Sequence, residues 1–322
     1  MKTRPFKQVD VFTAKPYFGN PLAVVLDGTG LSTEEMAHFA QWTNLSETTF
    51  VLPPSDTVLQ AGAVRADYRV RIFTPGGELP FAGHPTLGSC HAWLQAGGQP
   101  QVSGQIIQEC QIGLVHIRRD GARLAFAAPP LKRSAPNPAL MAQVASALGL
   151  KDSQIIAAQL LDNGPVWLGL LLDRPQTVLQ LAPNHSELKH LGLKVGVASV
   201  QRAPTATGLI ARSNREAKAF GARAGGQKGD GNDHDTHDTA TPGLEVRAFA
   251  APIGVNEDPV TGSLNASLAQ WLIAEGRAPE RYLAAQGACL GRDGRVHIER
   301  DAQGQVWVGG NSVTCIDGTV VL

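Results

Sequence analysis

The sequence predicts an α+β fold composed of two similar domains, and three observations lead to this prediction. The chain has 322 residues, and about 150 residues per domain gives two domains. Short runs of alternating polar and apolar residues, typical of half-buried strands, are interspersed with short helical segments. A unit of strand, loop and small-sided helix occurs once in each half of the chain. We interpret the repeat as an internal duplication with a pseudo-twofold axis; chance similarity is the alternative, because the two units share few identities.

The first part of the chain is expected to contain strands and one capped helix. Alternating, continuously apolar or β-branched runs predict four strands, at residues 8–12, 22–26, 48–52 and 68–73. Ser32 followed by Glu35 fits a capping box, in which each side chain accepts a hydrogen bond from the other residue's backbone. A helix is therefore predicted from this point to about Trp42.

A loop over residues 74–85 then leads into a helix expected from Thr86 to about Gln95. Small and uncharged residues such as Gly88, Ser89 and Cys90 occupy much of this helix. A helix without a charged face is usually buried on all sides, here by the surrounding strands. Cys90 is expected to be a small core residue.

The second half repeats this layout. Residues 244–249 alternate as 68–73 do, and a loop over 250–263 precedes a second small-sided helix that reaches Trp271. Between the halves, the Pro-rich segment 128–138 is the predicted linker. A helix is predicted over 138–148, and the β-branched segment 313–322 is a predicted final strand.

Composition and charge narrow the class of protein. Lys plus Arg number 28 and Asp plus Glu number 28, so the chain lacks the basic footprint of a nucleic-acid-binding protein. No stretch approaches the roughly 20 apolar residues that cross a bilayer. We expect neither a signal peptide nor a membrane partner. The four cysteines are too widely spaced for a zinc motif or a dense disulfide framework, which favours a reducing cytoplasm: Cys90, Cys110, Cys289 and Cys315.

One stretch, residues 222–243, has low complexity. His234 and His237 lie there among several aspartates, a composition that could suggest a metal site. The surrounding residues cannot form a core that would fix ligand geometry. We therefore expect a flexible surface insertion rather than a metal centre.

The candidate site residues cluster at three places. Two are the helix N-termini, whose free N–H groups suit a carboxylate or an enolate-like oxygen. They carry Gly83, His84 and Thr86 in the first case and Asp258, Thr261, Gly262 and Ser263 in the second. The third is Glu47, which alone would be a solvated loop charge. At the mouth of an apolar pocket its pKa would rise toward the range useful for acid–base catalysis.

Several segments together resemble the phenazine-biosynthesis isomerase family (PhzF-like proteins), within the diaminopimelate-epimerase-like fold. They run in the family's order over nearly the whole chain: FGNPLAV (18–24), NLSETTFVL (44–52), IFTP (72–75), ELPFAGHP (78–85), EDPVTGS (257–263), QG (286–287), LGR (290–292) and GTVVL (318–322). Only residues 222–243 look foreign to the family.

The resemblance implies two domains, each a β-barrel-like sheet wrapped around a central helix, with the active site in the cleft between them. It places the final strand in the first domain, so the domains would be residues 1–130 plus 312–322 and residues 131–311. It implies that Glu47 is the catalytic acid/base and that no cofactor or metal is needed. The residues implied to bind substrate are Gly83, His84, Asp258, Gly262 and Ser263. Individually, His84 or Ser263 could simply cap its helix, and Asp258 could simply form a turn.

Two departures from related patterns restrict the chemistry. The amino-acid epimerases of this fold use two cysteines, and Ala82 and Pro259 stand at those positions here. Two-thiol racemisation is therefore excluded, while proton transfer by one carboxylate is retained. The second departure is the GRDG sequence at 291–294 where the phenazine enzymes carry Gly-Arg-Pro-Ser, which leaves the role of Arg292 open.

These expectations favour a cofactor-independent isomerase that moves a proton within a small carboxylate-bearing cyclic or amino-acid-like substrate. The phenazine-type isomerisation of a dihydro-hydroxyanthranilate is the nearest named reaction. Two alternatives are a lyase or epimerase acting on a hydroxylated amino acid, and a catalytically silent small-acid binding protein. Whether the chain forms a homodimer is left open.

Overall fold

The computed structural model describes residues 1–55, 65–201 and 241–322. The predicted insertion lies outside these residues except for 241–243. The six α-helices of the described chain are α1 (Thr33–Thr43), α2 (Gly83–Gln95), α3 (Pro138–Leu148), α4 (Pro175–Gln180), α5 (His185–His190) and α6 (Gly262–Ala274).

The strands of the first half, together with the last strand of the chain, are β1 (Thr3–Val11), β2 (Asn20–Val25), β3 (Glu47–Leu52), β4 (Tyr68–Thr74), β5 (Gly77–Leu79), β6 (Gln105–Cys110), β7 (Gly113–Asp120), β8 (Arg123–Ala127) and β18 (Ser312–Val321). Those of the second half are β9 (Lys132–Ser134), β10 (Ile155–Asp162), β11 (Val166–Leu172), β12 (Lys194–Val200), β13 (Leu244–Ala250), β14 (Val255–Asp258), β15 (Arg281–Gln286), β16 (Gly294–Arg300) and β17 (Val306–Gly310).

Strand pairing follows the same order in both halves. In the first, β1–β2 is antiparallel, β2–β3 parallel, β3–β4 antiparallel, β4–β6 parallel, and β6–β7 and β7–β8 antiparallel. In the second, β10–β11, β11–β12, β12–β13, β13–β15, β15–β16 and β16–β17 repeat that order of directions. Short β5 and β14 fold back on β4 and β13. The halves join through the antiparallel pair β8–β17.

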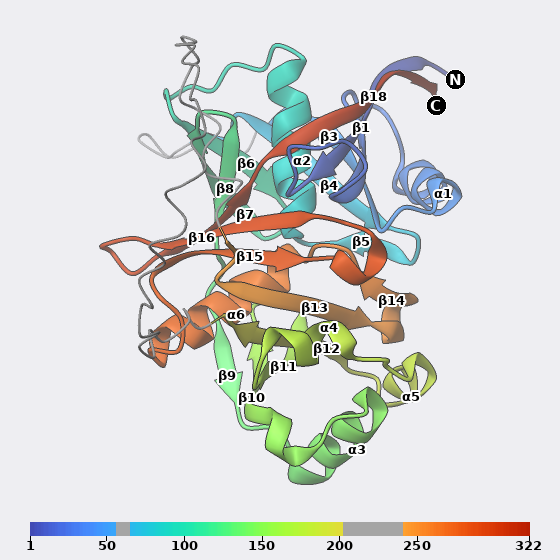
Figure 1. Ribbon diagram of the computed structural model, residues 1–322. Coiled ribbons are helices and arrows are strands. Elements are labelled where there is room, and N and C mark those ends of the chain that lie inside the picture. Colours follow the sequence, from blue (N-terminus) through green and yellow to red (C-terminus); the bar gives the residue numbers. More distant parts are fainter. Residues whose placement is uncertain (56–64, 202–240) are drawn as a thin grey trace, which may run out of the picture.

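The chain passes between the halves twice. It leaves the first half after β8 and enters the second through β9, which pairs with β10. It returns after β17, because β18 pairs antiparallel with β1 from Thr3↔Val321 to Val11↔Ser312. The two termini therefore lie side by side (Figure 1). This pairing confirms the prediction that the last strand returns to the first half, and the predicted linker contains both a crossing and the short strand β9.

Each half has one buried helix, as the small and uncharged sequences predict. Helix α2 packs on β1, β2, β3 and β8, and α6 packs on β10, β11, β16 and β17. Cys90 is fully buried in the core, as predicted. The remaining helices lie outside: α1 covers β3 and β4, while α3, α4 and α5 cover the second half (Figure 1). The described residues thus form a mixed α/β fold, in which two central helices occupy the core.

The starts of both central helices differ from the sequence prediction. Helix α2 begins at Gly83 rather than Thr86, because Pro85 fits a first helical turn, where a backbone N–H has no partner within the helix. Helix α6 begins at Gly262. Neither helix has a side-chain cap, so the alternative in which His84 or Ser263 simply caps its helix is wrong. The capping box at Ser32 and Glu35 is confirmed.

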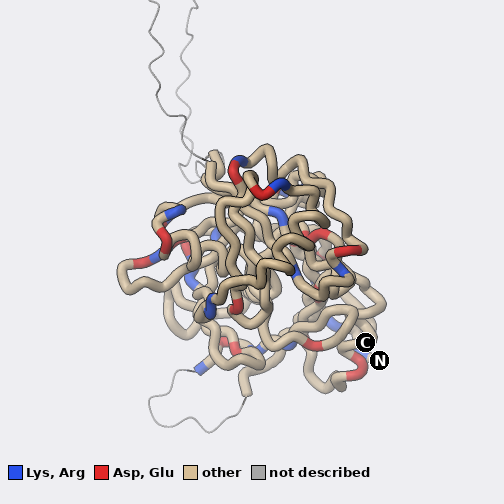
Figure 2. Tube along the Cα trace, turned by 90° about the horizontal axis from the view of Figure 1, so that it is seen from below, with Lys and Arg blue, Asp and Glu red and all other residues tan. Residues whose placement is uncertain are grey.

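Acidic and basic residues are interspersed along the described chain in the view of Figure 2. In the described ranges, no helix combines the length and the apolar character needed to span a membrane. Among the same residues, no group of three or more His, Cys, Asp or Glu side chains is arranged to hold a metal ion. The His-rich candidates His234 and His237 lie outside the described residues.

Candidate active site

The N-termini of α2 and α6 meet at the junction of the two halves. A Cβ atom added to Gly262 would lie 3.1 Å from the Cα atom of Gly83 and 3.2 Å from the backbone nitrogen of His84. A Cβ added to Gly83 would lie 2.6 Å from the ring of Phe126. Both glycines therefore permit a close backbone approach that any larger residue would prevent. The two helix N-termini at which the sequence places candidate residues therefore lie against each other.

We predict that Gly83→Ala destabilises the protein by about 1–3 kcal/mol, because the added methyl group overpacks this junction. The backbone shift that relieves the overlap would also displace His84. Gly318→Ala is a matched control, since nothing lies within 4 Å of a Cβ atom there. Chemical denaturation of both variants measures the difference, and equal stability would contradict the close packing of the helix ends.

Glu47 is the first residue of β3, at the edge of this junction. Its Oε2 atom lies 3.4 Å from Nε2 of His84, and the side chains are 16% and 5% exposed. Neither atom has a hydrogen-bond partner among the described residues. Such unpaired buried atoms are costly unless a ligand completes them. Glu47 and His84, predicted separately from two loops, are thus brought together.

The titratable groups of the site have strongly shifted pKa values. Burial raises the pKa of Glu47 to about 7. Burial, assisted by the nearby charge of Glu47, raises the pKa of Asp258 to about 6. Burial lowers the pKa of His84 to about 4, so its imidazole is neutral at pH 7. The raised pKa values of Glu47 and Asp258 are typical of residues that transfer protons, because the charged and neutral forms become similar in free energy near neutral pH.

A hydrogen-bond network fixes Asp258 between the halves. Asn20 donates through Nδ2 to Oδ1 of Asp258 and to the carbonyl of Val260, both at 2.9 Å. Thr261 donates its hydroxyl to Oδ2 of Asp258 at 2.6 Å. Gln286 donates to the Asp258 carbonyl and accepts from the backbone of Thr261. Because Asn20 comes from β2, this network ties the first half to the start of α6.

Ser263 lies in the first turn of α6 and contacts the strands of the second half. Its hydroxyl accepts a hydrogen bond from the indole nitrogen of Trp167 at 3.1 Å. Its carbonyl accepts one from Nδ2 of Asn163 at 3.0 Å. The hydroxyl retains hydrogen-bonding capacity as a donor, which a substrate oxygen could accept.

Sequence analysis missed three members of the site: Asn20, Gln286 and Lys194. The first two stand within segments that carry the family resemblance, and that was the available signal. Lys194 begins β12 and interacts electrostatically with both Glu47 and Asp258. No local motif marks it. Arg292, whose role the sequence left open, donates a hydrogen bond to the carbonyl of Tyr17 at 2.8 Å and so links two loops.

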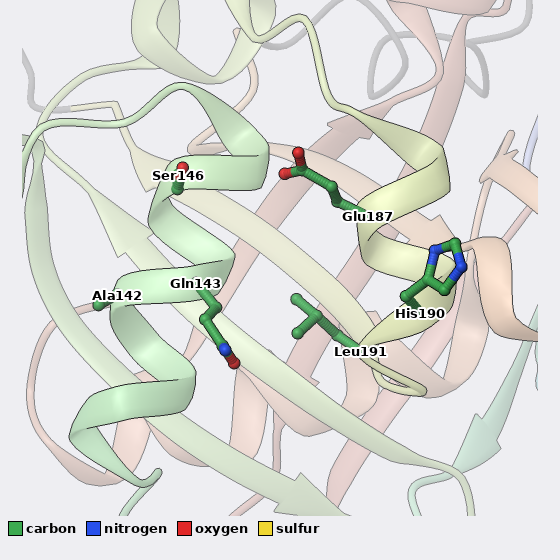
Figure 3. A pocket seen from close by; sticks show the side chains of 6 residues that line it. All are labelled: Ala142, Gln143, Ser146, Glu187, His190 and Leu191. Carbon is green, nitrogen blue, oxygen red and sulfur yellow. The ribbon is translucent and has the colours of Figure 1, made fainter.

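A separate cavity of about 490 Å³ lies between α3 and α5 (Figure 3). Its lining residues are Ala142, Gln143, Ser146, Glu187, His190 and Leu191. None of the predicted site residues is among them. The candidate active site therefore remains the junction of α2, α6 and β3.

Comparison with known proteins places this geometry in a family. The family model described as phenazine biosynthesis-like protein (PhzC-PhzF) matches residues 9–215 and 232–318. The chain belongs to this family. Antisense-enhancing sequence 1 of Schizosaccharomyces pombe is 34% identical over 332 residues, covering 99% of each protein. Trans-2,3-dihydro-3-hydroxyanthranilate isomerase of Pseudomonas aeruginosa is 28% identical over 323 residues, covering 98% of each.

Solved structures of PhzF-family and epimerase proteins have similar folds. The phenazine biosynthesis protein, PhzF family, of Bacillus anthracis superposes with a TM-score of 0.75 at 20% identity over 100% of each chain. A hydroxyproline epimerase of Agrobacterium vitis superposes with a TM-score of 0.55 at 14% identity, covering 99% of this chain and 93% of that one. The predicted likeness to PhzF-like proteins and to the epimerase-like fold is thus confirmed.

Proposed function

We propose that this member of the PhzF-like family is an isomerase that moves a proton within a small carboxylate-bearing substrate, cyclic or amino-acid-like, without a cofactor. One observation carries the proposal: Glu47, a buried carboxyl with a raised pKa, faces His84 where the two helix N-termini meet. The isomerase named among the relatives supports the reaction type.

In the proposed mechanism, the Glu47 carboxylate removes a proton from a substrate carbon. The resulting carbanion is stabilised as an enolate-like form by the N–H groups at the starts of α2 and α6. Glu47, now protonated, returns the proton to another carbon on the same face of the substrate. A group whose pKa lies near neutral can perform both steps at similar rates.

The remaining predicted residues position the substrate in this proposal. Neutral His84 offers a hydrogen bond beside Glu47, and Asp258 is held rigidly by Asn20 and Thr261. Ser263 offers its hydroxyl from the other half. Fixing the reacting carbon near Glu47 would lower the entropic part of the barrier.

We also propose that the two halves are pseudo-symmetric domains with the site in the cleft between them. The identical order of strand pairings supports this division. Residues 1–130 with 312–322 would form one domain and residues 131–311 the other. Because the chain crosses twice, the domains would move about a hinge rather than separate freely.

Trans-2,3-dihydro-3-hydroxyanthranilate in heavy water provides the direct test. Isomerisation would move a hydrogen between substrate carbons without loss of water from the molecule. Deuterium would enter the product whenever protonated Glu47 exchanges with the solvent before it returns the proton, as followed by NMR and mass spectrometry. Loss of water would instead favour a lyase. Binding without turnover, for this compound and a panel of hydroxylated amino acids, would favour a small-acid binding protein.

We predict that the exchange rate rises with pH through the pKa of Glu47, about 7. Only the carboxylate form can accept the first proton. The rate should therefore fall about tenfold for each pH unit below that pKa. A profile of kcat/KM against pH measures the change. A rate that stays constant well below pH 7 would mean that another group removes the proton.

A further inference from the structure

Glu47 and Lys194 occupy equivalent positions in the two halves. Glu47 is the first residue of β3 and is paired with Leu22 of the parallel neighbour β2. Lys194 is the first residue of β12 and is paired with Trp167 of the parallel neighbour β11. Strands β3 and β12 have the same place in their halves' pairing order. The second half thus presents an ammonium where the first presents the acid/base carboxyl.

The surroundings of Lys194 belong to the candidate site. Its Nζ atom lies 5.2 Å from the ring centroid of Trp167, whose indole donates to Ser263. Burial lowers the pKa of Lys194, while the charges of Asp258 and Glu47 raise it. Within the described residues, however, no carboxylate lies within 4 Å of its Nζ atom. The ammonium thus interacts electrostatically with two carboxyl groups but forms an ion pair with neither among the described residues.

This arrangement leaves a cation that lacks a fixed counter-ion. A partly desolvated ammonium is costly unless an anion pairs with it. Neither site carboxyl is a free counter-ion at neutral pH: a pKa of about 7 leaves about half of Glu47 protonated, and both carboxylate oxygens of Asp258 already accept hydrogen bonds, from Asn20 and Thr261. An ammonium also cannot accept a proton, so its available role is to bind negative charge.

We propose that Lys194 is a specificity-determining residue that binds the carboxylate of the substrate, across the site from Glu47. The inference rests on the proposed function in one respect, namely that the reacting carbon of the substrate faces Glu47. The preference for an acid over its neutral amide depends on Lys194 alone and can be measured without turnover.

Paired probes that differ only in charge test this inference. Anthranilate with anthranilamide, and trans-4-hydroxy-L-proline with its amide, are titrated calorimetrically into the full chain. At least one acid should bind more tightly than its amide. In Lys194→Met, the affinity for that acid should fall about 10- to 100-fold, the usual effect of losing a charge-assisted hydrogen bond, and the affinity for its amide should change little.

Three further variants make the outcome decisive. Lys194→Arg should restore much of the preference, which also controls for misfolding of Lys194→Met. Lys189→Met, at an exposed position on α5, should leave the preference for the acid over its amide unchanged. Glu47→Gln should keep the preference for the acid although it loses proton exchange. Failure of the proposed role of Glu47 can therefore be distinguished from failure of the proposed role of Lys194. The inference is overturned if the parent binds no acid more tightly than its amide. It is also overturned if Lys194→Met lowers the affinities for acid and amide equally, or lowers neither.

Discussion

Glu47→Gln is expected to lose proton exchange by about 10²–10⁴-fold, the usual contribution of a general acid–base residue. The amide keeps the shape of the side chain but cannot accept a proton from carbon. Because Oε2 of Glu47 has no hydrogen-bond partner among the described residues, the change breaks no bond at that atom. Ligand binding should therefore survive, and the exchange rate in heavy water is the measurement.

A stability measurement distinguishes this loss from misfolding. The pKa of Glu47 is raised from 4.5 to about 7 in the folded state, so the folded state binds more protons between these values. Its contribution to stability accordingly decreases as the pH rises through that window. Glu47→Gln removes this penalty and should be at least as stable as the parent at neutral and alkaline pH.

The matched control is Glu34→Gln, at an exposed position on α1, which should exchange protons at the parent rate. Turnover of Glu47→Gln at the parent rate would show that Glu47 is not the acid/base. A Glu47→Gln protein that melts far below the parent at alkaline pH would instead show a structural role for the carboxylate.

Individual helices and strands could be predicted from short sequence patterns, because their ends depend on neighbouring residues. The capping box predicted the start of α1, and the Pro-rich linker predicted the start of α3 at Pro138. The short strands β5 and β14 were not predicted, because three or four residues show no period and their pairing depends on β4 and β13. Alternation predicts a strand but not its neighbour, so the join between β8 and β17 could not be foreseen.

In the candidate site, too, some residues could be predicted from the local sequence, whereas the contacts between them could not. The loops that carry Glu47, His84 and Asp258 stand out because small and polar residues precede buried elements. The contacts that shape these residues come from distant parts of the chain, as with Asn20, which is 238 positions from Asp258. Lys194 has an ordinary strand environment in the sequence, and only the parallel pairing of β11 with β12 brings it beside Trp167.

Removal of β18 is expected to have the largest effect on stability. A chain that ends at Gly310 loses the strand that pairs with β1 along its whole length. It also loses the ion pair between Lys7 and Asp317, at 2.6 Å, and the contact of Thr314 with His91 of α2, at 3.1 Å. The exposed edge of β1 would present unpaired N–H and C=O groups, which favour aggregation.

We therefore expect this shortened chain to be insoluble, or to melt well below the parent without a cooperative transition. Residues 1–130 alone should fail to fold for the same reason, since they too lack β18. Loss of β18 would also release α2, whose first turn holds Gly83 and His84, so proton exchange should be lost with stability. Circular dichroism melting and the exchange assay measure both effects.

Complementation provides the control that separates a missing strand from nonspecific damage. A synthetic peptide of residues 311–322 is added to the freshly diluted shortened chain. It should restore a cooperative transition whose melting temperature rises with the logarithm of the peptide concentration, because a ligand that binds only the folded state stabilises it by mass action. A scrambled peptide of the same composition should not. If the shortened chain melts and exchanges protons like the parent without any peptide, then β18 does not support the first half, and the site does not depend on the second chain crossing.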